Sequence, residues 1–580
     1  MFKRLHNENG YALFLSLLVI LLFSLLTMLL LSVVVSGAKK NVIREHHVQA
    51  GELAEKGVEH LTSQIQKDLE DMVGEKGGIK RSLYLDEIQK YLNETHQCKQ
   101  SVHTVESATG KYAVCIESWR HVNGDPDSLR KEVTINSRGY VDGKWKELKA
   151  TILVGASDIP DALNYALGAH RSCSGNKDCI DGEGNLFLHG GAEIYGDMKV
   201  DGNIITSNRA HAILLNRSVW VDSLFPSVFP GPKSKEARLI LGGDIYTFSH
   251  RPDNYDEHIR NNSFSSRYYK KVNHINEAFE NPPKVLKRKP VREVINITEK
   301  ENSYKLDFHD PSVVKIQNTT IKNTNYSGKK VFPYRWSNRT DGNYTLEGDN
   351  TFGRFATDGN LKIINKENRF RTTNIEQGMY VKGNLEIGNM DIRDTDYNIG
   401  KYQKIRLNGP IYVNGNLTIK GADAEINSII YVNGNVTIKN ARINGLNVNG
   451  YDGSLIIFAN QAINIANISV NQDEPSNIKG FFYSEDALEM YGVGSNIKID
   501  GGISAKRIVL NAIRGRASDS HFHGAQYRRD KYFEGVNGQK SRQSRLRIVY
   551  NPDIIKTYSD LKEEEPYVEK IAPPRLVNRQ

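Results

Sequence analysis

The first strong pattern in the chain is an apolar run from Tyr11 to Val35, in which no residue is charged. A helix of that length reaches ~38 Å, enough to cross a hydrocarbon core of ~30 Å with some tilt. The run therefore predicts a transmembrane helix over residues 11–35, preceded by a short cytoplasmic segment at residues 1–10. A secretory signal cleaved before Ala38 and a buried soluble helix are the alternatives.

A second helical pattern follows directly and predicts an amphipathic helix over residues 36–77. Its apolar positions recur at spacings of three and four residues, which places them on one face with Glu and Lys opposite. These positions are Ala54, Val58, Leu61, Ile65, Leu69 and Met72. Gly74, Gly77 and Gly78 end the periodicity, so the helix is expected to stop there.

Short alternating segments then predict β-strands. Lys111–Ile116 and Lys131–Asn136 alternate apolar and polar residues, and turn-forming sequences separate the second segment from Leu148–Val154. We expect these strands to form a meander that packs on the amphipathic helix. The result would be a small α+β module over residues 78–165.

A repeated phrase dominates the second half of the chain. Its clear copies are Met379–Ile387, Ile411–Ile419 and Ile430–Ile438, which begin 32 and then 19 residues apart, in the range of solenoid turns. If equivalent positions stack, Asn414 and Asn433 form a ladder of amides, whereas in a stack of antiparallel hairpins Asn-Gly is only a turn. We favour stacking.

The predicted fold class is therefore mainly β. After the transmembrane and amphipathic α-helix and the α+β module, we expect a right-handed parallel β-helix, or solenoid, over residues 166–515. A polar excursion at about 248–350 interrupts it, and a polar C-terminal segment follows at residues 516–580.

Composition supports a large water-exposed remainder. The 580 residues are too many for one compact core, and only 39% are hydrophobic. The net charge of +9 is spread along the chain, which favours contact with an anionic cell-surface polymer over sequence-specific nucleic-acid recognition. The densest basic run could meet such a polymer or be a solvated excursion; it contains Lys284, Lys287, Arg288, Lys289 and Arg292.

The four cysteines fall into two local pairs. Cys98 with Cys115, and Cys173 with Cys179, would form two small disulfides in an oxidising compartment. Other connectivities and free thiols remain open. Neither pair has the CxxC spacing of a zinc site.

The N-terminal segment resembles that of PilX-type minor pilins. The resemblance covers about the first 60 residues and rests on Asn9–Leu13, the apolar run and Ala50–Glu59. It implies cleavage by a prepilin peptidase between Gly10 and Tyr11, and association with other pilin-like subunits in a type IV pilus or pseudopilus. Leu15 stands where many type IV pilins carry Glu. The repeats are similar in texture to right-handed β-helix proteins and to bactofilin-like, polymer-forming repeats.

Candidate chemistry is sparse. Asp519, His521 and His523 would share one face of a strand, a donor set suited to a divalent metal, and a solvated loop is the alternative. Asp391, Asp394 and Asp396 lie close together, but no sequence-distant acid is predicted to join them. We therefore expect no catalytic site and no cofactor.

These observations predict a single-pass protein of the cell membrane with most of its chain outside the cell. Its expected role is structural: a pilin-like, pilus-associated or adhesive surface protein in contact with the lipid bilayer. A membrane-tethered β-helix enzyme acting on polysaccharide and a polymer-forming scaffold are the alternatives.

Overall fold

The computed structural model describes two compact units of the chain. The first comprises residues 1–158 and 565–580, and the second comprises Ile159–Glu564. The structure describes residues 8–579 apart from 75–78, 99–102, 108–109, 123–125, 127, 157–159, 173–181, 215–216, 233, 249–267, 289–294, 296, 336–341, 365–370, 395–397, 449, 471, 518–532, 562–566 and 569–570.

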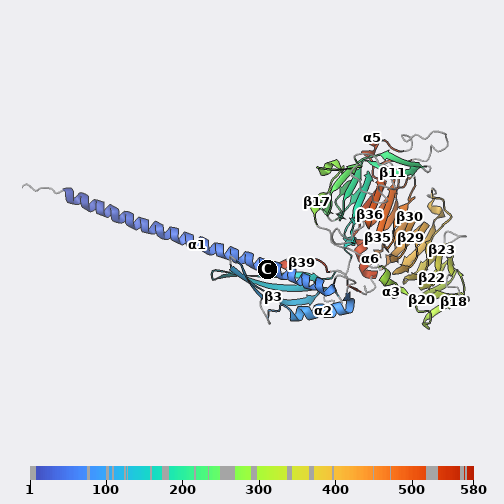
Figure 1. Cartoon of the computed structure of the whole chain (residues 1–580), viewed down its shortest axis with the longest axis horizontal. Helices are drawn as coiled ribbons and strands as arrows, with labels where there is room; N and C mark the ends of the chain where they lie inside the picture. The colour runs from blue at the N-terminus through green and yellow to red at the C-terminus, as the bar shows by residue number, and fades with distance from the viewer. Residues whose placement is uncertain are drawn as a thin grey trace, which may run out of the picture. The chain divides into compact units, whose positions relative to one another are not determined.

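The two predicted N-terminal helices form one continuous helix, α1, from Glu8 to Val73 (Figure 1). Its second half packs on an antiparallel sheet of order β2-β3-β4-β5-β39. Together with α2, these elements form what we call the head. The other elements of this unit are β1 (Ile79–Lys80), α2 (Arg81–Glu94), β2 (His103–Ser107), β3 (Gly110–His121), β4 (Arg130–Val141), β5 (Lys144–Gly155), β38 (Tyr567–Val568) and β39 (Arg575–Arg579).

The buried face of α1 is the one that the periodicity predicts. Ala54, Leu61, Ile65 and Leu69 are at most 2% exposed. Leu61, Ile65 and Leu69 join β-strand side chains such as Val133 in the core of the head. This packing explains why the second half of α1 is amphipathic, since its opposite face meets solvent.

The second unit is inserted between two neighbouring strands of the head. β5 pairs antiparallel with β39, and Ala156 forms a bridge with Ile571 just before the chain enters β39. Part of the predicted polar C-terminal segment, residues 516–580, completes the head sheet as β39. β37 (Leu546–Tyr550) and the amphipathic helix α6 (Asp553–Leu561) also lie in this stretch, within the second unit.

The second unit, which we call the parallel-strand unit, is mainly β. Most of its strands pair in parallel around one continuous core of Ile, Leu, Val and Ala side chains. Its first strands are β6 (Leu167–Ala169), β7 (Asn185–Gly190), β8 (Glu193–Tyr195), β9 (Met198–Val200), β10 (Ile204–Ser207), β11 (Arg209–Leu214), β12 (Arg217–Asp222), β13 (Ser227–Phe229), β14 (Arg238–Leu241), β15 (Ile245–Phe248), β16 (Tyr269–Lys271) and β17 (Lys284–Lys287).

The later strands begin inside the predicted polar excursion. Parallel pairing occurs inside this excursion, where β17 pairs with β14 and β18 pairs with β20. These strands are β18 (Val313–Ile316), β19 (Thr320–Lys322), β20 (Asn325–Pro333), β21 (Asn343–Glu347), β22 (Asn350–Thr357), β23 (Asn360–Ile364), β24 (Thr372–Ile375), β25 (Met379–Val381), β26 (Leu385–Ile387), β27 (Gln403–Asn408), β28 (Ile411–Val413), β29 (Leu417–Val432), β30 (Val436–Gly445), β31 (Asn447–Val448), β32 (Tyr451–Asp452), β33 (Leu455–Ala459), β34 (Ile463–Ala466), β35 (Ser476–Gly492), β36 (Ile497–Ala512) and β37 (Leu546–Tyr550).

The repeated phrases stack in parallel and in register. Tyr380 pairs with Tyr412, and Tyr412 pairs with Tyr431. The predicted amide ladder is present, because Asn433 Nδ2 donates to Asn414 Oδ1 at 3.0 Å. The alternative of antiparallel hairpins is therefore wrong for these copies.

A second ladder explains why Gly precedes Asn in each phrase. The backbone N–H of Asn416 donates to Asn384 Oδ1, and that of Asn435 donates to Asn416 Oδ1, each at 2.8 Å. The amide oxygen reaches the next strand through the space where a side chain on Gly415 would stand. Glycine is required there because the neighbouring asparagine occupies its Cβ position.

The first strands of the parallel-strand unit stack on its last ones. β36 pairs with β35 on one side and with β6 and β7 on the other. Figure 1 shows this as green-blue strands lying beside β36. Residues 167–169 and 185–190 are thereby brought beside residues 503–512, far away in the sequence.

Candidate functional site

The most exposed apolar surface of the described chain is the N-terminal half of α1. We call residues 13–35 the apolar span. Its large side chains are all exposed, from Val19 at 43% to Met28 at 73%. In the part of the chain that the structure describes, α1 is the one helix long and apolar enough to cross a membrane. A surface of this kind needs lipid or other apolar helices around it.

The predicted processing bond lies at the beginning of this helix. Gly10 and Tyr11 fall in the first turns of α1, so their backbone is helical. Leu15 follows within the apolar span and is 53% exposed. Cleavage between Gly10 and Tyr11 remains a prediction.

The predicted cysteine pairs have different outcomes. A disulfide joins Cys98 and Cys115, which ties the segment after α2 to β3 in the head. Cys173 and Cys179 lie outside the described residues.

The structure describes only part of the predicted metal and acid clusters. Asp519, His521 and His523 lie outside the described residues, as does Asp396. Asp394 forms ion pairs with Lys420 and Lys439 at 3.1 Å. Over the described ranges, no group of three or more His, Cys, Asp or Glu side chains is arranged to hold a metal ion.

Part of the predicted basic run already forms ion pairs within the protein. Lys284 and Lys287 belong to β17 and form ion pairs with Glu236 and Asp244 on neighbouring segments. Lys289 and Arg292 lie outside the described residues. The described part of the run therefore joins strands, and its charge is partly neutralised.

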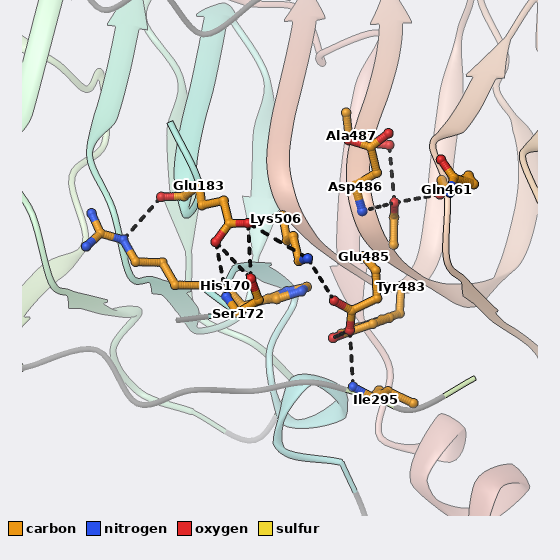
Figure 2. Close-up of polar contacts among 12 residues, drawn as sticks. His170, Ser172, Glu183, Ile295, Gln461, Tyr483, Glu485, Asp486, Ala487 and Lys506 are labelled. Atoms are coloured by element: carbon orange, nitrogen blue, oxygen red, sulfur yellow. Dashed lines mark hydrogen bonds and ion pairs between the residues drawn. The ribbon is translucent and has the colours of Figure 1, made fainter. Parts of the chain in front are cut away.

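A polar cluster lies where the first and last strands of the parallel-strand unit meet (Figure 2). Lys506 Nζ lies 3.3 Å from Glu485 Oε2 and 3.8 Å from Glu183 Oε1. Ser172 Oγ donates to Glu183, and the backbone N–H of Ile295 donates to Glu485. One lysine thus bridges two carboxylates that are about 300 residues apart in the sequence.

The cluster is enclosed. The side chains of Glu183 and Glu485 are 6% and 10% exposed. His170 stacks on Tyr483 at a ring distance of 4.7 Å, and burial lowers its pKa to about 4. A neutral histidine and two carboxylates that already form ion pairs and hydrogen bonds are typical of a buried structural network. Such a network leaves little access for a polymeric substrate.

Sequence reasoning missed a stripe of aromatic side chains on the outer face of β25, β28, β29, β33 and β35. Its members pair in register on neighbouring parallel strands, and they are Tyr380, Tyr412, Tyr431, Phe458 and Tyr483. The sequence does contain a signal for it. Each phrase copy has three consecutive apolar or aromatic residues, which indicates a strand buried on both faces.

Two segments cover this stripe. The strap, which we define as the described residues of 295–308, places Ile297 and Tyr304 in the aromatic cluster, and α6 adds Ile554 and Tyr558. Tyr304 lies 5.8 Å from the ring of Tyr412. Part of the predicted polar excursion is therefore packed against the strands.

Comparisons with known proteins add little. No protein-family model matches the sequence, and no curated protein matches it. Among solved structures, the chain is similar to the crystal structure of the competence-associated pilin ComZ from Thermus thermophilus, at 12% sequence identity and a TM-score of 0.17. The alignment covers 92% of this chain and 97% of that chain. A TM-score of this size does not establish a shared fold.

Proposed function

We propose that this protein is a membrane-anchored, pilin-like structural protein that displays the parallel-strand unit outside the cell. One observation carries the proposal: a single helix whose first half is apolar and uncovered continues into a second half that packs on an antiparallel sheet. The first half is suited to lipid and to packing against similar helices. The second half is the spine of a folded head.

The energetics favour a membrane over water. Burying one large apolar side chain is worth about 1.5–3 kcal/mol, and nearly every residue of the apolar span is of that kind. The total is on the order of tens of kcal/mol. Long downstream domains cross membranes largely regardless of flanking charge, which supports an external position for both folded units.

The parallel-strand unit is proposed to be a right-handed β-helix that acts by its shape. In-register pairing of successive phrases and the asparagine ladders support this proposal. End-to-end polymerisation is disfavoured. At one end, the antiparallel strand β16 covers β15 and Phe279 fills the core; at the other, the short strands β18 and β19 carry exposed Lys315 and Lys322.

N-terminal sequencing of the membrane-extracted protein tests the pilin-like part of the proposal. Tyr11 as the first residue would support prepilin-peptidase processing, and a Gly10→Ala variant that keeps its first ten residues would strengthen it. Met1 as the first residue would leave a simple signal anchor. Intact protein dissolved in the cytosol would refute membrane anchoring.

A second candidate function is that of a polysaccharide-active enzyme. The observation in its favour is that Glu183 and Glu485 approach the same lysine. A Glu183→Gln/Glu485→Gln variant separates the two functions. We expect lower stability and no loss of a hydrolytic or lyase activity, and a wild-type activity on cell-wall polysaccharide that this variant abolishes would favour the enzyme.

A further inference from the structure

One end of the head lies beside α1 close to the apolar span. The turn between β4 and β5 reaches α1 at His46, whose Nδ1 is 3.5 Å from Asp142 Oδ2. His46 lies eleven residues after Val35, which is ~16 Å along a helix. If α1 is anchored as proposed, this end of the head faces the membrane.

Trp145 is exposed at this end. Its side chain is 55% exposed at the start of β5, and the guanidinium of Arg138 lies 5.8 Å from its ring. Lys144 and Lys146 flank it. An exposed tryptophan among basic side chains is costly in water but typical of the level of lipid headgroups, where the ring is half-solvated.

The adjoining stretch of α1 has the same character. Lys39, Lys40 and Arg44 follow the apolar span, and Val42 and Ile43 beside them are 48% and 43% exposed. Three acids oppose the six basic residues of helix and turn. They are Glu45, Asp142, which meets His46, and Glu147, which pairs with Arg138. The surface is therefore net positive.

Helix length supplies the geometry. The run of ~38 Å fits a hydrocarbon core of ~30 Å at a tilt of about 38°, within the range of membrane helices. At that tilt His46 stands ~13 Å above the core. The sheet of the head packs ~10 Å from the axis of α1. If it lies on the side of α1 that the tilt turns towards the membrane, it stands ~6 Å closer to the hydrocarbon core than the helix axis does. The turn that carries Trp145 then lies ~7 Å above the core, inside the headgroup layer.

We propose that this end of the head docks on an anionic lipid surface. Trp145 lies among the headgroups, while Arg138, Lys144 and Lys146 meet lipid phosphates together with the basic residues of α1. These contacts determine the direction in which α1 tilts. The inference rests on the proposed membrane anchor.

The test uses the full chain reconstituted in phosphatidylcholine vesicles with or without phosphatidylglycerol. Lipids brominated near the headgroup quench nearby tryptophan emission. The difference between wild type and Trp145→Phe isolates Trp145 from the other three tryptophans. We expect quenching of the Trp145 emission in anionic vesicles, and its loss in high salt.

Charge variants supply the controls. Lys144→Gln/Lys146→Gln should lose the quenching, whereas Lys149→Gln should keep it, since Lys149 lies further along β5 and pairs with Glu117. Protein that floats with anionic vesicles but shows no quenching of Trp145 overturns docking alone. Protein that does not float with any vesicle overturns the anchor and the docking together.

Discussion

The asparagine ladder makes the phrase glycines sensitive to a single methyl group. A Cβ added to Gly415 would lie 2.4 Å from Asn384 Oδ1 and 2.7 Å from the carbonyl oxygen of Gly383. Asn384 Oδ1 accepts from the backbone N–H of Asn416. The Gly415→Ala variant must therefore break this hydrogen bond or separate two stacked turns.

The expected cost follows from these contacts. Loss of the hydrogen bond costs about 1 kcal/mol. Strain from overpacking against backbone atoms adds about 1–3 kcal/mol. The lower entropy of the unfolded alanine chain offsets about 0.4–1 kcal/mol. We expect a net loss of about 2–3 kcal/mol in the free energy of unfolding of the parallel-strand unit.

Urea unfolding followed by far-ultraviolet circular dichroism measures this loss in detergent-solubilised protein. Gly494→Ala is the matched control, because a Cβ there meets nothing within 4 Å. Only the lower entropy of the unfolded alanine chain acts there, so this variant should be stabilised by about 0.4–1 kcal/mol. In an Asn384→Ala background the Gly415→Ala cost should fall by about 1 kcal/mol. Equal costs for Gly415→Ala and Gly494→Ala, or strict additivity with Asn384→Ala, would refute the ladder argument.

Three further predictions concern pH, the disulfide and the insertion. Burial lowers the pKa of His170 to about 4 and that of His189 to about 3, so the unfolded chain binds more protons below about pH 6.5. Stability should therefore fall by about 4 kcal/mol between pH 7.5 and pH 5, and urea titrations of a His170→Gln/His189→Gln variant should show a flatter profile. Replacing Cys98 and Cys115 by Ala should destabilise the head by about 3 kcal/mol, given a sequence separation of 17, as thermal unfolding would measure. Replacing residues 159–564 by a short flexible Gly/Ser linker should leave a folded head, because β38 and β39 are retained and Ala156 already pairs with Ile571; loss of protease resistance would contradict this.

Features repeated along the sequence were predictable. The spacing of Leu61, Ile65 and Leu69 identifies the buried face of α1, because a helix brings residues three and four apart onto one side. The phrases predict the Asn414–Asn433 contact for a similar reason, since stacked turns repeat their chemistry. The mainly β composition of the second unit follows from the same pattern.

Contacts between distant, unrepeated segments were not predictable. Lys506 bridges Glu183 to Glu485 because the first strands of the parallel-strand unit stack on its last strands. The sequence around Glu183 contains no signal of that stacking. β39 is exposed along its whole length, so its sequence lacks the alternation that marks a strand. The strap was missed because its few apolar residues, such as Tyr304, are scattered among polar ones.

The insertion of the parallel-strand unit orders the biosynthesis of the head. The ribosome must make Ile159–Glu564 between β5 and its partner β39, so β5 keeps an open edge throughout that time. A polypeptide released early would retain this edge, which invites pairing with other chains and capture by chaperones or proteases. The head sheet can therefore be completed only after the parallel-strand unit has been translated in full.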